Sequence, residues 1–492
     1  MPTVPIGVAG PSYKTTDALI VSPQVTINYY PQVIEQIING VSRVSELRLV
    51  PTPGLSSYVN LTGSVTGPVR GLLNYNEGSE LISVIGPHVY STDTTPTTTF
   101  RGVVANDDLP VRMVANVSGQ VMILSAGSAY ILDSGVVTQI TDPDLLTSPL
   151  DIEFLDTYFI ALRDRLQQFQ ISSSNEGTTW SALEFTTLEA GENKQMAVLC
   201  DRLEAWFFGT KKTLIYYNSG NIDFPFDRRS GGVIELGCMA TRSPRRVNKS
   251  NIWLAADENG VGYFVKASGY QPQRISNHAL ETELRSYPRI DDCVSFVQCD
   301  RGHWFYWAWF PTANKTWVYD EGNNLWHQRA FWDTTGPIAQ QRAHRASCAT
   351  TFNNKLIVGD RENPILYIMD PWTYTDNGSK IQRERICPHI MRGNRSSEYL
   401  EYLAVRLIAQ TGVGLPVAST ADGYDPQISL SWSDDGGNTW SDEIPVSMGK
   451  LGEYSTIMEW RNLGSTNIAR TFKFKCMDIT PYQLVEAFAD VQ

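Results

Sequence analysis

The chain has 492 residues, 42% of them hydrophobic and 11% aromatic, so it can bury a large core and should hold more than one domain. Its formal net charge at pH 7 is −12, whereas proteins that grip duplex nucleic acid through phosphates are usually basic. Because no basic start followed by an apolar core occurs, nor any run of about 18 apolar residues, we expect a soluble chain made in a cytoplasm.

Residues 1–55 are rich in proline, which excludes long helices. Residues 21–30 and 47–50 are predicted strands, and Pro51-Thr-Pro-Gly54 forms a turn. The segment contains few residues that could form a hydrophobic core of their own. The sequence therefore predicts an extended N-terminal arm over residues 1–55, which packs on a neighbouring subunit or returns to the C-terminal domain.

From residue 56 to 395, short strands alternate with turns rich in Gly, Asn, Asp and Pro. The predicted strands are 72–75, 81–85, 121–124, 158–162, 205–208, 214–217, 252–255, 262–265, 304–310, 316–319 and 356–358. Helical periodicity is nearly absent, and residues 278–285 are the best exception. At roughly 40–50 residues a blade, this pattern indicates a β-propeller of about seven blades, with a range of six to eight.

Two stretches are typical of propeller blades. Residues 304–310 contain six aromatic side chains in seven positions, which indicates an inner strand covered on both faces. Trp317-Val-Tyr-Asp320 predicts a strand, residues 321–324 a turn, and Leu325-Trp326 the return strand. Residues 357–369 repeat this strand, turn, strand pattern.

The pattern changes at about residue 396. Ile428, Leu430 and Trp432 alternate with serines, and Phe472 and Phe474 alternate with lysines. Strands of this kind have one buried and one solvated face. Residues 396–492 are therefore predicted to form a C-terminal β-sandwich.

An eight-residue Asp-box phrase occurs twice. The complete copy is Ser433, Asp435, Gly437, Thr439 and Trp440, and the second, with Asn for Asp, is Ser173, Asn175, Gly177, Thr179 and Trp180. In such a hairpin the Asp or Asn side chain caps the turn, Gly adopts a positive φ, and Trp packs into the sheet. We expect both tryptophans to be largely buried.

No motif for catalysis, a metal or a cofactor emerges. The six histidines lack metal-ligand spacing, and neither a phosphate-binding glycine loop nor a nucleophile elbow occurs. The adjacent acids Asp434 and Asp435 would point to opposite faces of a strand, so they do not suggest an acid/base pair. The seven cysteines have no Cys-x-x-Cys spacing and are expected to be buried free thiols. We therefore predict a non-enzyme without cofactors.

Basic residues gather in two places. Arg242, Arg245, Arg246 and Lys249 form either a phosphate-facing channel loop or a solvated loop at a subunit contact. A looser cluster near the domain boundary contains Arg383, Arg385, Arg392 and Arg395, with the same two interpretations.

Several short phrases are spread over most of the chain. They are Asn28-Tyr-Tyr-Pro31, Pro51-Thr-Pro-Gly-Leu55, residues 209–217, Arg285-Ser-Tyr287, Val318-Tyr-Asp320, Trp460-Arg-Asn-Leu-Gly464 and residues 470–477. Together they resemble the packaged-DNA stabilisation proteins of short-tailed bacteriophages, also called tail hub or nozzle proteins. That family has no catalytic motif to carry over.

The resemblance implies a structural protein of the virion tail, assembled in the bacterial host cytoplasm. It implies a homo-hexameric ring below the portal and adaptor that continues the DNA channel, retains packaged DNA until genome ejection, and carries receptor-binding spikes or fibres. The partners would be further copies of the chain, the portal-adaptor protein, a tail spike or fibre protein, and, where one is used, a tail needle or plug. Double-stranded DNA would pass without specific binding, and the chain would insert into no membrane.

Two alternatives remain open from the residues. Sialidases carry Asp-boxes on propeller blades, so a glycoside hydrolase of that type is one; it requires a deep pocket with clustered arginines and carboxylates. A propeller scaffold for protein binding is the other, and it predicts a monomer.

Overall fold

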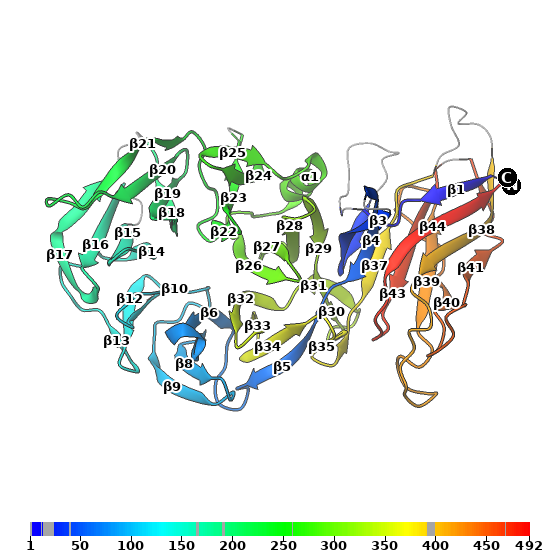
Figure 1. Cartoon of the computed structure of the whole chain (residues 1–492), viewed down its shortest axis with the longest axis horizontal. Helices are drawn as coiled ribbons and strands as arrows, with labels where there is room; N and C mark the ends of the chain where they lie inside the picture. The colour runs from blue at the N-terminus through cyan, green and yellow to red at the C-terminus, as the bar shows by residue number, and fades with distance from the viewer. Residues whose placement is uncertain are drawn as a thin grey trace.

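The computed structural model describes residues 2–10, 12, 24–38, 41–163, 167–188, 192–257, 259–390, 399–467 and 469–492, with the side chains of 34–46 left aside. It is elongated, with a β-propeller at one end and a β-sandwich at the other (Figure 1). The predicted mainly β fold is confirmed. The described residues contain one α-helix, α1 (His278–Ser286), and one short 3-10 turn, η1 (Asn76–Gly78). None of their helices is long and apolar enough to cross a membrane.

The propeller consists of seven four-stranded antiparallel blades within the described residues, inside the predicted range; five are separate sheets and two are parts of larger sheets. Six of them are formed by four consecutive strands each. The first two are β6–β9 (Val69–Tyr75, Glu80–Ile85, His88–Asp93, Thr98–Val103) and β10–β13 (Arg112–Ala115, Val121–Ser125, Ser128–Asp133, Val136–Gln139), followed by β14–β17 (Pro149–Leu155, Tyr158–Arg163, Gln168–Ser173, Glu176–Thr187) and β18–β21 (Gln195–Asp201, Glu204–Gly209, Thr213–Asn218, Phe226–Ile234). The last two are β22–β25 (Arg245–Val247, Ser250–Ala256, Gly262–Ser268, Gln271–Arg274) and β26–β29 (Val294–Asp300, His303–Phe310, Lys315–Asp320, Leu325–Gln328).

The seventh sheet closes the ring with strands from distant parts of the chain. It combines β32 (Ala346–Phe352), β33 (Lys355–Asp360) and β34 (Ile365–Asp370) with β5 (Gly54–Asn60). Strand β5 lies antiparallel to β34, with Asn60 opposite Ile365 and Leu55 opposite Met369. The blades surround the propeller axis, with β6–β9 next to this last sheet (Figure 1).

Aromatic side chains fill the spaces between neighbouring blades. Strand β27, the predicted aromatic strand, pairs with β26 on one side and β28 on the other, so it is an inner strand as expected. Its Trp307 is fully buried and stacks on Phe296, with ring centroids 4.8 Å apart. Burial on both faces explains why the strand tolerates almost no polar residue.

Helix α1 forms where the helical periodicity was predicted. The Asn277 side chain caps it by accepting a hydrogen bond of 2.8 Å from the backbone N–H of Leu280. Leu280 and Leu284, four residues apart, are both buried against the blade of β22–β25. The helix ends at Ser286, two residues before a proline.

The sandwich packs two sheets face to face around one apolar core. One sheet contains β1 (Thr3–Ile6), β3 (Tyr29–Ile38), β4 (Val41–Pro51), β38 (Leu400–Ala409), β41 (Met458–Arg461), β42 (Ser465–Thr466) and β44 (Leu484–Val491). The other contains β2 (Val25–Ile27), β37 (Arg383–Ile386), β39 (Gln427–Ser433), β40 (Ile444–Ser447) and β43 (Thr471–Cys476). Ile428, Leu430, Phe472 and Phe474 point into this core, as their alternation predicts.

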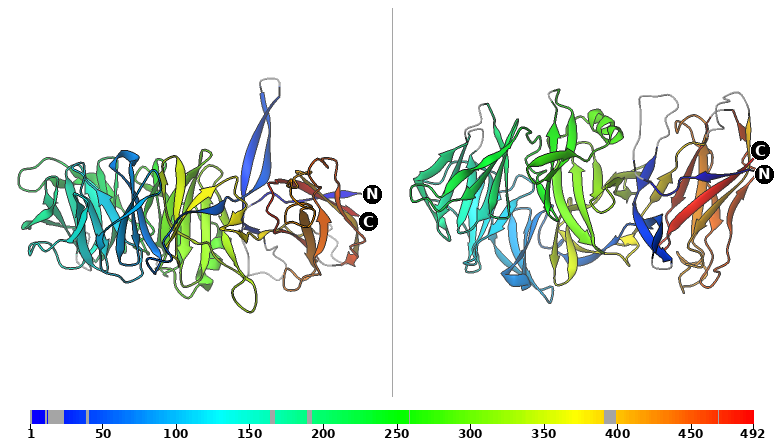
Figure 2. Two further views of the ribbon diagram at one scale, coloured as in Figure 1. Left: turned by 90° about the horizontal axis from the view of Figure 1, so that it is seen from below. Right: turned by 45° about the horizontal axis from the view of Figure 1, so that its top comes forward.

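The N-terminal segment is distributed over both domains. Strand β1 pairs with β44 of the sandwich, and β5 belongs to the propeller. Strands β3 and β4 form a long antiparallel hairpin that projects from the body (Figure 2). The predicted strand at 21–30 is interrupted at Asn28, and its residues 21–23 lie outside the described part.

Strand β2 joins the two domains through one continuous sheet. It lies between β29 of the propeller and β37 of the sandwich, so that nine strands follow one another. Two small hairpins flank this junction, one of β30 (Ala330–Asp333) and β31 (Gln340–Ala343), the other of β35 (Thr375–Asp376) and β36 (Ser379–Lys380). The propeller and the sandwich are thus connected through a shared sheet.

Candidate functional site

The complete Asp-box forms a tightly bonded turn after β39. The Asp435 carboxylate accepts hydrogen bonds from the hydroxyls of Ser433 and Thr439, both at 2.6 Å, and from the backbone N–H of Thr439 at 2.9 Å. Gly437 has a φ of +94°, and its carbonyl accepts a bond of 3.1 Å from Nε1 of Trp440. The hydrogen bonds from Ser433 and Thr439 hold the pKa of Asp435 well below its ordinary value.

Asp435→Asn should therefore destabilise the protein at neutral pH more than in acid. A depressed pKa in the folded state contributes stability above the unfolded pKa of about 3.9, and this contribution is lost as the pH falls through the folded value. Thermal unfolding at pH 7 and at pH 3 measures the difference. Asp442→Asn is the control, since the Asp442 carboxylate has no hydrogen bond or ion pair among the described residues. Equal losses for Asp435→Asn at both pH values would contradict the capping role.

The second copy shares the Trp–Gly bond but caps its turn differently. Nε1 of Trp180 donates to the Gly177 carbonyl at 2.9 Å, as in the complete copy. Asn175 has a φ of +54°, but its buried side-chain Oδ1 has no hydrogen-bond partner among the described residues. Glu176 does the capping instead, accepting bonds from the N–H (3.0 Å) and hydroxyl (2.7 Å) of Thr178. The hydroxyls of Ser173 and Thr179 are exposed.

The two tryptophans differ in burial. Trp180 is 4% exposed and packs between two blades, as expected. Trp440 is only half-buried, with the Lys473 ammonium 4.2 Å from its ring centroid. Trp440 is therefore less deeply buried than Trp180.

The basic residues after Ala240 do not form one cluster. Arg242 and Arg245 line a hollow near the propeller axis. Arg246, the next residue in β22, points elsewhere and forms an ion pair of 3.0 Å with Asp201. Lys249 is exposed outside the hollow.

The hollow lies where the first strands of several blades begin. It has a volume of about 90 Å³, and its charged lining residues are Asp107, Arg112, Asp151, Arg242 and Arg245. Arg112 starts β10, Asp151 follows the start of β14, and Arg245 starts β22. The propeller therefore brings together charges that are far apart in the sequence.

Most of these charges are paired. Arg112 forms ion pairs with Asp151, at 3.4 Å, and with Glu153. Asp151 also accepts a hydrogen bond of 3.0 Å from the backbone N–H of Val198. Burial raises the pKa of Glu153, while Arg112 opposes that change.

Clustered arginines and carboxylates are what the hydrolase alternative requires, and a sialidase also needs a tyrosine nucleophile beside them. No tyrosine lines the hollow. Tyr306 interacts electrostatically with Arg245, but it is fully buried, and its hydroxyl donates a hydrogen bond of 2.8 Å to the Ser243 carbonyl. The described residues hold no group of three His, Cys, Asp or Glu side chains that suits a metal. All seven cysteines are free thiols, with Cys299 exposed.

Asn28 connects the propeller to the sandwich. Its φ of +58° lies in the left-handed region, which separates β2 from β3. Its side-chain Nδ2 donates to the carbonyls of Ala330 (2.9 Å) and Gln382 (2.8 Å), and its Oδ1 accepts from the Ala330 N–H (2.9 Å). Its backbone N–H donates to Gln328 and its carbonyl accepts from Thr52, both at 3.0 Å. The sequence analysis placed Asn28 inside one predicted strand and assigned it no role, although Asn is one of the few non-glycine residues that readily adopt a positive φ.

Buried arginines hold the N-terminal strands onto β37. Arg385 donates to the hydroxyl of Thr26 at 2.8 Å and to the carbonyl of Gly7 at 2.9 Å, and Arg383 donates to the Asp478 carbonyl at 3.2 Å. Neither side chain reaches solvent. Two members of the predicted second cluster are therefore structural, and the other two, Arg392 and Arg395, lie outside the described residues.

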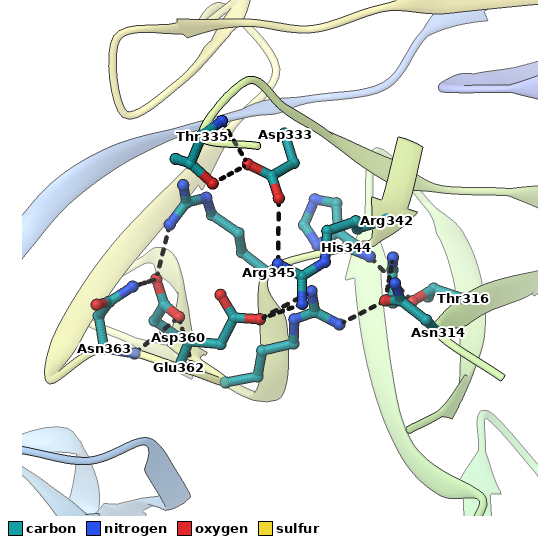
Figure 3. A network of polar contacts seen from close by, with 12 residues as sticks. Asn314, Thr316, Asp333, Thr335, Arg342, His344, Arg345, Asp360, Glu362 and Asn363 are labelled. Carbon is teal, nitrogen blue, oxygen red and sulfur yellow. Dashed lines mark hydrogen bonds and ion pairs between the residues drawn. The ribbon is translucent and has the colours of Figure 1, made fainter. Parts of the chain in front are cut away.

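A network of ion pairs fastens the β30–β31 hairpin to the last blade (Figure 3). Arg342 bridges Asp333 at 3.1 Å and Glu362 at 3.2 Å. Arg345 pairs with the buried Asp360 at 3.3 Å. The hairpin leads directly into β32, so this network fixes the blade next to the junction.

Asp376 is a buried acid at the same junction. It is 2% exposed, and its Oδ1 has no hydrogen-bond partner in the described part of the chain. Burial raises its pKa to about 7, although Arg383, Arg345 and Arg329 favour the charged form. The acid is therefore protonated in the folded state at a pH where the unfolded chain has lost that proton.

Asp376→Asn should stabilise the protein in alkali but not in acid. Because the folded-state pKa is raised, the contribution of Asp376 to stability falls as the pH rises from about 4 to 7, by at most about 1.4 kcal/mol per pH unit. Urea unfolding at pH 5 and pH 8 tests this, with Asp370→Asn as the control at a more exposed position. An asparagine variant that gains nothing at pH 8 would show that the carboxylate is ionised and satisfied.

Comparison with known proteins finds matches to both domains. One family model, described as bacteriophage P22 Gp10, beta-propeller, matches residues 27–374; another, bacteriophage P22 Gp10, beta-sandwich, matches residues 391–492. No curated protein matches the chain. Solved structures with a similar fold include virginiamycin B lyase from Staphylococcus aureus, with 12% identity and a TM-score of 0.43 over 63% of this chain and 98% of that one. Another is BamB from Moraxella catarrhalis, with 11% identity and a TM-score of 0.35 over 72% and 98%. At these scores the likeness carries no argument about function.

Proposed function

From the fact that this chain belongs to the bacteriophage P22 Gp10 family of phage DNA stabilisation proteins, we propose that it is the hub, or nozzle, of a phage tail. In this proposal six copies form a ring below the portal and adaptor. The ring continues the DNA channel, retains packaged DNA until ejection, and carries spikes or fibres. The single observation that carries the proposal is the family match across both domains.

The direct connection between the domains supports a structural role. The shared nine-stranded sheet and the bonds of Asn28 connect the propeller directly to the sandwich. A channel wall that holds DNA under pressure needs subunits that do not hinge. The formal charge of −12 also suits a wall along which DNA moves without phosphate contacts.

A closed ring requires heterologous contacts, in which one patch meets a different patch on the neighbour. Among the exposed apolar side chains of the described chain, two groups lie at separate places. Phe100, Val103 and Val136 lie on the outer strands β9 and β13 of adjacent blades. Leu451, Tyr454 and Ile457 lie on the loop between β40 and β41 of the sandwich. We assign the sandwich loop to the subunit contact of the ring.

Replacing Leu451, Tyr454 and Ile457 together by serine should block ring assembly on the portal–adaptor complex. Their exposure predicts a change in thermal midpoint of no more than a few degrees, since surface substitutions usually shift stability by less than about 0.5 kcal/mol. Co-sedimentation with portal–adaptor complexes measures the loss. Ile222→Ser, on an exposed propeller loop, is the matched control. Normal assembly of the triple variant would exclude this loop from the contact.

The proposed function itself is tested in phage particles. Particles lacking this protein should package DNA normally and then lose it, and the purified chain should bind the portal–adaptor complex and restore retention. Genome retention is measured by nuclease sensitivity, and electron microscopy of restored particles gives the ring symmetry. Particles that keep their genomes and remain infectious without the protein would overturn the proposal.

A further inference from the structure

Two arginines in the propeller hollow form no hydrogen bond or ion pair with a carboxylate in the described part of the chain, although carboxylates lie near them. The Arg242 guanidinium has no hydrogen bond or ion pair within the described residues, although it lines the hollow. The Arg245 Nη1 donates only to the neighbouring Pro244 carbonyl, at 2.7 Å. Both side chains are half-buried, which makes an uncompensated charge expensive.

The carboxylates of the hollow are already occupied by other groups. Asp107 accepts a bond of 2.5 Å from Arg70 and one of 3.0 Å from the N–H of Leu109. Asp151 accepts from backbone amides and, like Glu153, pairs with Arg112. Asp151 and Asp107 still attract Arg242, and Asp151 and Glu153 attract Arg245, but only through space. The guanidinium groups of both arginines therefore remain free to bind a ligand in the hollow.

The backbone that carries these two arginines is fixed on both sides. The Arg242 carbonyl accepts a hydrogen bond of 3.0 Å from the Ser295 N–H. Ser243, between the two arginines, accepts 2.8 Å and 3.1 Å bonds from the Tyr306 hydroxyl and the Leu254 N–H. A guanidinium presented from an ordered backbone loses little entropy when it binds a ligand.

We propose that this hollow binds one small inorganic oxyanion of the phosphate class between Arg242 and Arg245. Guanidinium forks match tetrahedral oxyanions with paired, charge-assisted hydrogen bonds. The volume of about 90 Å³ admits a single such ion and excludes a duplex. Burial also lowers the pKa of Arg242, and lowers that of Arg245 to about 10, so a bound anion would stabilise both charges. This proposal concerns the isolated chain and does not rest on the role in the tail.

Titration calorimetry on the full chain tests the site, with inorganic phosphate as the probe and sodium chloride at matched ionic strength as the reference. We expect saturable binding of one phosphate per chain. Arg242→Gln and Arg245→Gln should each weaken it about tenfold or more, the equivalent of one charge-assisted hydrogen bond. Lys249→Gln, which removes an exposed positive charge seven residues from Arg242, should leave binding unchanged.

The thermal stability of the variants provides a second measurement besides calorimetry. Because burial disfavours the Arg242 charge more than Asp151 and Asp107 favour it, Arg242→Gln should raise the thermal midpoint in phosphate-free buffer and abolish the further rise that phosphate gives the wild type. In a separate titration, a short DNA duplex is added to the protein in place of phosphate, which distinguishes binding of free phosphate from binding of nucleic-acid phosphate. Phosphate that binds no better than chloride, duplex binding without phosphate binding, or phosphate affinity unchanged in both arginine variants would each overturn the proposal.

Discussion

Asn28→Ala should destabilise the protein by about 4 kcal/mol. The substitution removes three side-chain hydrogen bonds, two of them to Ala330 and one to Gln382, each contributing about 0.5–1.5 kcal/mol. It also forces alanine into a φ of +58°, which costs about 1–2 kcal/mol. The midpoint of urea unfolding measures the loss.

Two further variants separate these causes. Asn28→Gly loses the same bonds but accepts the backbone conformation, so it should be about 1 kcal/mol more stable than the alanine variant. Asn28→Asp keeps the acceptor for Ala330 and loses both donated bonds. Alanine and glycine variants that both unfold like the wild type would mean that the junction does not depend on this residue.

Trp180→Ala should cost about 3–5 kcal/mol, whereas Trp440→Ala should cost only about 1–2 kcal/mol. Trp180 is buried between blades, where its loss leaves a cavity lined by residues such as Phe159 and Ile131. Trp440 is half-buried and loses mainly its contact with Lys473 and its bond to Gly437. The tryptophans of the two copies of the eight-residue motif thus make different contributions to the free energy of unfolding.

Chemical unfolding of the two variants, followed by far-ultraviolet circular dichroism, checks this ranking. Trp372→Ala is the control, because this ring is 76% exposed and its removal should shift stability by less than about 0.5 kcal/mol. Equal losses from Trp180→Ala and Trp440→Ala would show that the turn, and not the depth of burial, determines the contribution of the ring.

Local patterns were sufficient to predict the fold class. The aromatic stretch 304–310, the Trp317–Asp320 strand and the helix at 278–285 are all determined by neighbours within one hairpin or turn. The alternation of Ile428 and Leu430 with serines likewise indicates which face of β39 is buried. In each case the residues that pack together are close in the sequence or follow one period.

The N-terminal pairings could not be predicted, because their partners are distant. Nothing in residues 3–6 indicates that they pair with β44, nor that β5 completes a blade with β34. Arg245 and Arg246 were predicted to lie in a loop, whereas they are neighbours in β22 and therefore point to opposite faces.

The buried arginines carried no signal at all. Arg470 is 2% exposed, bonds Asp434 through two nitrogens at 2.7 Å each, and lies 4.6 Å from the Tyr402 ring centroid. A lone arginine in an alternating strand is expected on the solvated face. Only the tertiary structure shows that its partner lies on the adjacent β39 turn.

Closure of the propeller by β5 has a consequence for how the protein is made. During translation, residues 54–60 leave the ribosome long before their partner strand, Ile365–Asp370, has been synthesised. Until then the nascent chain holds an unpaired strand at one end of an unfinished ring, and exposed strand edges are prone to associate with other chains. Folding of the last blade must therefore wait for nearly complete translation, which makes the slow step one of long-range strand pairing. Truncated products that stop before residue 365 should accumulate as aggregates or chaperone-bound intermediates and never as smaller propellers.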